Sequence, residues 1–245
     1  RSTLFPYTTL FRSTNRTMNE AIKYVDEAIR SRHSMRRFLP TPVPKATVRE
    51  LLELAACAPS GTNVQPWRVY ALSGEAKNAL SAAIMAKHAA GETDGGRELD
   101  YYPKEWVEPW LSRRRKCGLG LYSLLGIQKG DTVRMKEQAG RNYIFFDAPV
   151  GLIFTLDNRL GKGMLVDCGM FLGNLMIAAR ARGLDTCPQA FFADYHKTIR
   201  AHLGIADNEI VYCGMALGYA DPNAPENTLR TEREAVEVFT DFRGF

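Results

Sequence analysis

Apolar residues recur with helical spacing in four stretches of the chain. In the first, Asn19 stands where a helix cap is expected, and Ile22, Val25 and Ile29 follow on one face. The second stretch must end before Pro59, because the residue before a proline avoids helical geometry. The pattern predicts helices over residues 19–31, 47–58, 74–88 and 166–182.

Three shorter runs have the apolar, β-branched and aromatic content of strands. They are WRVYAL at residues 67–72, PVGLIFTL at 149–156 and EIVYCGMALGY at 209–219. Strands separated by helices indicate an α+β or α/β fold. Since no repeat or linker divides the chain, residues 18–245 are expected to form a single domain.

The first residues of the chain fit neither pattern. The stretch TLFPYTTLFRS at residues 3–13 has no strand alternation and no helical spacing, and it lacks the features of a secretory signal. It resembles the translation of a short-read sequencing adapter. We therefore expect residues 1–17 to be a non-native, disordered extension and Met18 to be the natural start.

The charge of the chain argues against a nucleic-acid partner. The formal net charge is +5, and it falls to +3 when Arg1 and Arg12, the two arginines of residues 1–13, are left out. The one dense basic run, residues 113–116, is interpreted as a solvated helix face.

The cysteines and the hydropathy pattern indicate the cellular compartment in which the protein is expected. Five cysteines, an odd number without a C-x-x-C pair, favour neither a disulfide framework nor a zinc site. No apolar run reaches the length of a membrane span. We expect a reduced, soluble protein of the cytoplasm with no membrane or metal partner.

A cationic cluster closes the first predicted helix. The segment RSRHSMRRF, residues 30–38, places five cationic residues beside Ser34. Cations are favourable at a helix C-terminus, so the cluster has a structural explanation. Forked guanidinium groups beside a hydroxyl also match phosphate oxygens, and both interpretations stay open on the residues alone.

A polar loop follows the second predicted helix. APSGTNVQPW, residues 58–67, gathers short hydroxyls and amides around Gly61, which permits a close backbone approach. Such side chains suit an ordinary turn, and they equally suit the edge of a heterocycle and a polyol chain.

Taken in order, these stretches resemble the FMN-dependent nitroreductase family. The pattern R-x-S-x-R-x-F at residues 32–38 is followed by P-S-G-x-N-x-Q-P-W at 59–67. The likeness continues through FFDAPVGLIFTLD, GMFLGNLMIAARARGLDTCPQ and NTLRTEREAVEVF, and so covers nearly everything from Asn19 onward. It is nearest to the nitrobenzoate-type branch.

The resemblance implies a nitroreductase-like α+β fold in an intertwined homodimer. A central, mostly antiparallel sheet is flanked by helices, and two FMN molecules lie at the dimer interface. Residues 221–245 form a C-terminal arm that reaches the partner subunit and adds a strand there. The arm carries Val236, Val238, Phe239, Phe242 and Phe245, and no further domain exists in the sequence to bury them.

The resemblance also assigns roles to residues. Arg32 and Ser34, with their neighbour His33, lie at the FMN phosphate and ribityl chain, and Arg36 lies at the pyrimidine end of the flavin. A second loop near the reactive nitrogen comprises Cys187, Pro188 and Gln189, with Cys187 read as a packed small hydrophobe. An edge loop contacts the flavin that is bound mainly by the other subunit, and it comprises Pro59, Ser60, Gly61, Asn63 and Gln65. A basic pair near the C-terminus, Arg230 and Arg233, lies at the phosphate.

The implied activity passes electrons from NADH or NADPH to nitroaromatic acceptors by a ping-pong mechanism. No G-x-G-x-x-G follows a strand, so no separate dinucleotide site is expected. The flavin carries the chemistry, and no catalytic side chain is assigned. His88, His196 and His202 are interpreted as surface residues. Alternatives are a quinone or activated-alkene reductase, a dehalogenase, or a non-catalytic flavin-binding dimer.

An aromatic segment is the candidate acceptor site. Residues 91–122 begin with the Gly- and Asp-rich stretch GETDGGRELD and continue with several aromatic residues. Packing of a surface helix pair is one explanation. A lid hinged at the glycines, with Tyr101, Trp106 and Trp110 offering stacking faces to a flat acceptor, is the other.

Overall fold

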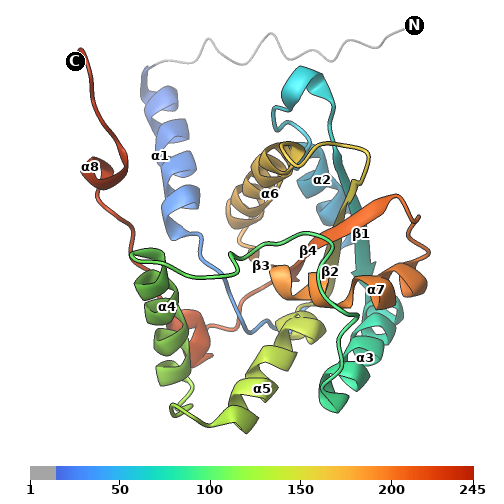
Figure 1. Cartoon of the computed structure of the whole chain (residues 1–245). Coiled ribbons are helices and arrows are strands. Elements are labelled where there is room, and N and C mark those ends of the chain that lie inside the picture. The colour runs from blue at the N-terminus through green and yellow to red at the C-terminus, as the bar shows by residue number, and fades with distance from the viewer. Residues whose placement is uncertain (1–14) are drawn as a thin grey trace, which may run out of the picture.

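A computed structural model describes the backbone of residues 15–245 and the side chains from residue 20 onward. Its centre is a four-stranded antiparallel sheet with the order β1-β2-β4-β3 (Figure 1). The three expected strands are confirmed as β1 (Trp67–Ser73), β2 (Val150–Asp157) and β4 (Glu209–Gly218). The fourth, β3 (Asp185–Gln189), was expected as a loop and instead forms the edge of the sheet beside β4.

The four expected helices are present, with shifted ends. They are α1 (Asn15–Ser31), α2 (Lys45–Ala55), α3 (Gly74–Ala90) and α6 (Met164–Arg180). Helix α1 begins four residues before the expected cap, and the suspect stretch 3–13 lies outside the described residues. Further elements are α4 (Trp110–Leu124), α5 (Thr132–Gly140), α7 (His196–Leu203), α8 (Val236–Phe239), and the 3-10 turns η1 (Gly61–Asn63), η2 (Arg141–Asp147), η3 (Ala190–Tyr195) and η4 (Pro225–Thr228).

Each face of the sheet has its own hydrophobic core. On one face, Leu152 and Phe154 of β2 pack with buried residues of α2 and α6. On the other, Ile153 packs with buried residues of α3, α7, η2 and η3. Because both faces of β2 are covered, its run is apolar almost throughout and does not alternate.

Glycine permits two aromatic rings to lie directly on the sheet. A Cβ added at Gly151 would lie 2.5 Å from the Phe145 ring, and one at Gly214 would meet the Phe192 ring. The two rings stack with their centroids 4.5 Å apart. Side chains at these positions in β2 and β4 would displace η2 and η3, which border the cavity described below.

The chain that leaves α1 runs along the free edge of β3. Ser34 forms a parallel bridge with Thr186, and the Met35 amide donates to the Thr186 carbonyl at 3.1 Å. Further on, Phe38 bridges Ala220, just beyond β4. These backbone contacts hold the cationic segment 32–38 against the sheet.

Apolar side chains remain uncovered at both ends of the chain. On α1, Ile22, Val25 and Ile29 are each at least half exposed. The C-terminal segment with α8 extends away from the sheet and its helices (Figure 1), and its valines and phenylalanines are exposed.

His196 was interpreted as a surface residue, but it is buried, with Nδ1 3.5 Å from a carboxylate oxygen of Glu98. Across residues 15–245, every helix is too short or too polar to cross a bilayer.

Candidate functional site

The cationic residues of segment 32–38 lie close to those of the C-terminal arm. Burial lowers the pKa of Arg32, and the nearby charge of Arg233 lowers it further. Burial likewise lowers the pKa of His33, with Arg230 as the next cause. Arg32, Arg230 and Arg233 form no salt bridge with any carboxylate in the described part of the chain. An anion bound among them would offset this repulsion, as a phosphate does.

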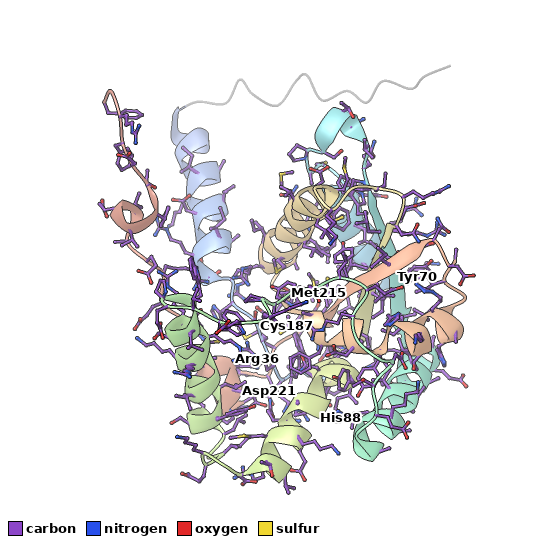
Figure 2. All side chains as sticks on the ribbon, viewed as in Figure 1. Arg36, Tyr70, His88, Cys187, Met215 and Asp221 are labelled. Carbon is purple, nitrogen blue, oxygen red and sulfur yellow. The ribbon has the colours of Figure 1, made fainter. Side chains whose placement is uncertain are left out.

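Arg36 connects this cluster to a cavity. Its backbone amide donates to Asn227 Oδ1 at 2.7 Å, and its guanidinium donates to the Ser34 carbonyl at 3.2 Å. Figure 2 shows Arg36 beside Cys187, and both residues line a cavity of about 610 Å³. The side chain therefore stands between the cationic cluster and the cavity.

Strand β3 supplies one wall of this cavity with Cys187, Pro188 and Gln189. Burial raises the pKa of the Cys187 thiol, so the group stays neutral and matches the expected packed hydrophobe. The Gln189 amide donates to the Asn142 carbonyl at 2.7 Å. Its Oε1 is buried without a hydrogen-bond partner in the described residues, which leaves an acceptor free for a bound molecule.

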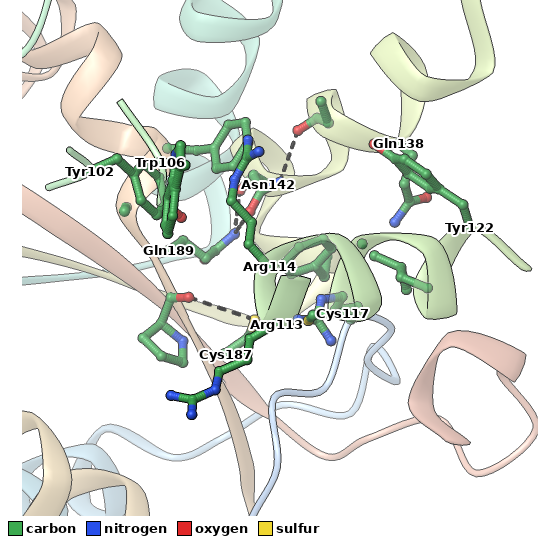
Figure 3. A pocket seen from close by; sticks show the side chains of 18 of the residues that line it. Tyr102, Trp106, Arg113, Arg114, Cys117, Tyr122, Gln138, Asn142, Cys187 and Gln189 are labelled. Carbon is green, nitrogen blue, oxygen red and sulfur yellow. Dashed lines mark hydrogen bonds between the residues drawn. The ribbon is translucent and has the colours of Figure 1, made fainter. Parts of the chain in front are cut away.

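Aromatic residues also line the cavity. Trp106 and Trp110 are among them, as expected of the acceptor segment, and Figure 3 shows Trp106 and Tyr102 beside Gln189. Tyr101 is not among them: it lines a second cavity of about 410 Å³, which is bordered by α6, β4 and the end of β3. Its neighbour Tyr102 takes the place at the main cavity, with its ring centroid 5.6 Å from that of Trp106.

The segment that leads to these aromatics is held to the body of the protein. Asp94 accepts from Lys87 at 2.6 Å and from the Thr198 amide at 2.7 Å. Arg97 makes two hydrogen bonds to Asp194, at 2.5 and 2.9 Å. The expected glycine hinge lies between these contacts, so any lid movement concerns the residues after them.

The polar loop 59–65 lies elsewhere in the subunit, between α2 and β1. The Gly61 amide donates to Asp167 of α6 at 3.1 Å, and the Gln65 amide donates to Ser60 Oγ at 3.0 Å. Pro59, Ser60, Gly61, Asn63 and Gln65 are all absent from the lining of the main cavity.

This loop is nevertheless built in an unusual way. Thr62, Asn63 and Gln65 have φ values of 48°, 60° and 51°, in the region that favours glycine. Strained backbone of this kind gathers at binding sites, where the surrounding structure maintains it. The loop is largely exposed, and it does not line the cavity to which Arg36 belongs.

Sequence reasoning missed the contribution of α4. Arg113 and Arg114 line the main cavity, so the run 113–116 is more than the solvated helix face that was expected. The sequence contained a signal for this face of the helix, because the residues of α4 that line the cavity recur every three or four positions from Trp110 onward. They are Trp110, Arg113, Arg114, Cys117, Gly118, Leu121 and Tyr122.

Comparison with known proteins gives a consistent result. The nitroreductase family matches residues 29–219. The 4-nitrobenzoate reductase of Pseudomonas putida is 42% identical over 220 residues, which are 90% of this chain and 96% of that protein. The nitrobenzene nitroreductase of Ectopseudomonas oleovorans is 38% identical over 219 residues, covering 89% and 96%.

A solved structure shares the fold. The FMN-dependent nitroreductase NfnB from Mycobacterium smegmatis, in complex with NADPH, superposes with a TM-score of 0.86 at 31% identity, covering 91% of this chain and 99% of the other. With the family match extending over most of the residues, this chain belongs to the nitroreductase family.

Proposed function

We propose that this protein is an FMN-dependent nitroreductase that transfers electrons from NAD(P)H to nitroaromatic acceptors. The observation that carries the proposal is the cavity lined by Arg36, by β3 and by aromatic residues of α4 and the segment before it. Its relatives are named for the reduction of 4-nitrobenzoate and nitrobenzene, and its structural neighbour for FMN and NADPH.

The residues fit the cofactor chemically. Arg32, Arg230 and Arg233 offer uncompensated guanidinium groups for the phosphate, and the Ser34 hydroxyl suits the ribityl chain. Arg36 supplies positive charge for the pyrimidine end, and the free Gln189 Oε1 can accept from a ring N–H. FMN, when bound, supplies the two-electron transfer between donor and acceptor.

The protein contributes position and electrostatics to this reaction. The rings of Trp106 and Trp110 can stack on a flat molecule, and β3 lines the same cavity. A positive side chain at Arg36 stabilises negative charge that develops next to it. Because donor and acceptor would use the same cavity, they bind in turn, which is the structural basis of a ping-pong mechanism.

We place the active enzyme in the cytoplasm as a homodimer. All five cysteines are free thiols, as is usual in a reducing compartment. The loop 59–65 does not reach the cavity of its own subunit, so a partner subunit is the natural recipient of its amides and hydroxyls.

Two measurements test the proposal. Purified protein saturated with FMN and desalted should retain the flavin. It should then oxidise NADH or NADPH when given 4-nitrobenzoate or nitrobenzene. Loss of all flavin on desalting contradicts the cofactor assignment. Rapid quinone turnover without nitro reduction favours a quinone reductase, and bound FMN that NAD(P)H does not bleach anaerobically favours a non-catalytic flavoprotein.

A further inference from the structure

The main cavity is distinctly cationic. Three guanidinium groups line it, those of Arg36, Arg113 and Arg114, and its lining includes no carboxylate in the described residues. Two of the three are already engaged: Arg36 donates to the Ser34 carbonyl, and Arg113 pairs with Glu234 at 2.9 Å. The third guanidinium is that of Arg114.

The Arg114 guanidinium forms no hydrogen bond or salt bridge with any residue from 20 to 245. Its guanidinium carbon lies over the Trp106 ring, 5.2 Å from the ring centroid. Figure 3 shows the two side chains next to each other at the cavity. Stacking on an aromatic face orients a guanidinium and leaves its in-plane N–H donors free.

The free donors suit one chemical group in particular. The planar fork of a guanidinium matches a carboxylate with two parallel hydrogen bonds. The aromatic walls at Tyr102, Trp106 and Trp110 suit the ring that carries such a group. The cavity thus combines a stacking surface for the ring with an unpaired cation for its substituent.

We propose that Arg114 binds the carboxylate of the acceptor and makes the enzyme selective for nitroaromatic carboxylates over neutral nitroarenes. The inference rests on the proposed function and names the acceptor class and the residue that selects it. Arg114 is a specificity residue here and takes no part in the electron transfer.

Steady-state kinetics with three variants test the inference. In Arg114→Met, kcat/KM for 4-nitrobenzoate should fall by about 10- to 100-fold, mainly through KM, because a charge-assisted contact is lost. The value for nitrobenzene should stay within about twofold. Arg114→Lys should recover part of the loss. Arg115→Met, a neighbour in the same basic run that does not line the cavity, is the matched control.

A binding measurement separates this inference from the proposed function. Benzoate cannot be reduced, and it should bind the FMN-loaded wild type more tightly than its neutral isostere benzamide. Arg114→Met should abolish the difference. If the wild-type protein reduces neither nitro compound, the proposed function fails, while the benzoate titration still decides the role of Arg114.

The donor is the competing source of negative charge, because NADPH carries a phosphate that NADH lacks. If Arg114→Met lowers kcat/KM for NADPH relative to NADH and leaves the ratio of 4-nitrobenzoate to nitrobenzene unchanged, Arg114 recognises the donor phosphate and the inference is overturned. The inference is also overturned if Arg114→Met changes neither the preference for NADPH over NADH nor the preference for 4-nitrobenzoate over nitrobenzene.

Discussion

At the scale of single residues, Arg32 offers the sharpest test of the cofactor site. Its charge faces Arg233 and lacks a carboxylate partner within the described residues. Replacing Arg32 by Ala should weaken FMN binding by about 1.5–3 kcal/mol, the range for a hydrogen bond to a charged group. Fluorescence titration of the FMN-free protein measures this change.

Arg30 provides the matched control for Arg32. It lies in the exposed last turn of α1, two residues earlier. Arg30→Ala should leave the dissociation constant for FMN unchanged. Equal losses in the two variants would mean that only the general positive potential of the segment matters, and would contradict a direct phosphate contact.

His33 makes the stability of the FMN-free protein depend on pH. Burial and the charge of Arg230 lower its pKa below the ordinary value of 6.5. The folded state therefore resists a proton that the unfolded chain accepts, and the free energy of unfolding decreases as pH falls through 6.5. His33→Gln should reduce this decrease.

Urea unfolding at about pH 7.5 and about pH 5.5 spans the relevant titration range. Arg230→Gln removes the second cause of the shift and should also reduce the pH dependence. A wild-type pH dependence in both variants would show that other groups govern acid stability.

At the scale of elements, α4 and the segment before it form the acceptor wall. We expect Trp106→Ala and Trp110→Ala to leave FMN content intact, because neither residue belongs to the cationic cluster. Both should change the relative turnover of different acceptors. Trp106→Ala should have the larger effect, since Trp106 also contacts Arg114 and Tyr102.

Kinetics over a panel of nitroaromatics, with flavin absorbance for FMN content, decide this prediction. Loss of FMN in both variants, or an unaltered acceptor profile in both, would make residues 101–110 part of the scaffold. The anchoring of Asp94 and Arg97 is independent of either outcome.

The elements also show where sequence reasoning succeeds and where it stops. The strand β2 and the helix α1 were predictable, because a continuous apolar run indicates a buried strand and 3.6-residue periodicity indicates an amphipathic helix. Strand β3 was not, since DTCPQ contains a proline and an aspartate and is a strand only because β4 pairs with it. Tyr101 and Tyr102 are adjacent in sequence, and only the tertiary packing decides which of them enters the cavity.

At the scale of the whole molecule, we propose that the site is completed by a second subunit. The cationic cluster and the main cavity come from segments that converge within the chain. Motif order predicted the cationic cluster and the β3 side of the cavity but missed Tyr102, Arg113 and Arg114. The loop 59–65 carries matching motif residues but does not line that cavity. Sequence similarity identifies such residues without telling which subunit they serve, because that depends on the assembly.

The uncovered apolar residues point to the same assembly. Phe239 and Phe242 are 69% and 60% exposed, and the outer face of α1 exposes Ile22 and Val25. Burial of these side chains against a partner gives the hydrophobic contribution that a stable dimer requires. We therefore expect the double variant Phe239→Asp with Phe242→Asp to shift the protein towards monomer.

Sedimentation velocity over a range of concentrations measures the dimer, and flavin absorbance after desalting measures the cofactor. The double variant should lose FMN as it dissociates, because separation removes the loop 59–65 of the other subunit from each site. Val133→Asp places one such charge at an exposed valine on α5 and should change neither quantity. A monomeric double variant that binds FMN as tightly as the wild type would mean that each subunit completes its own site, and the loop would then need another role.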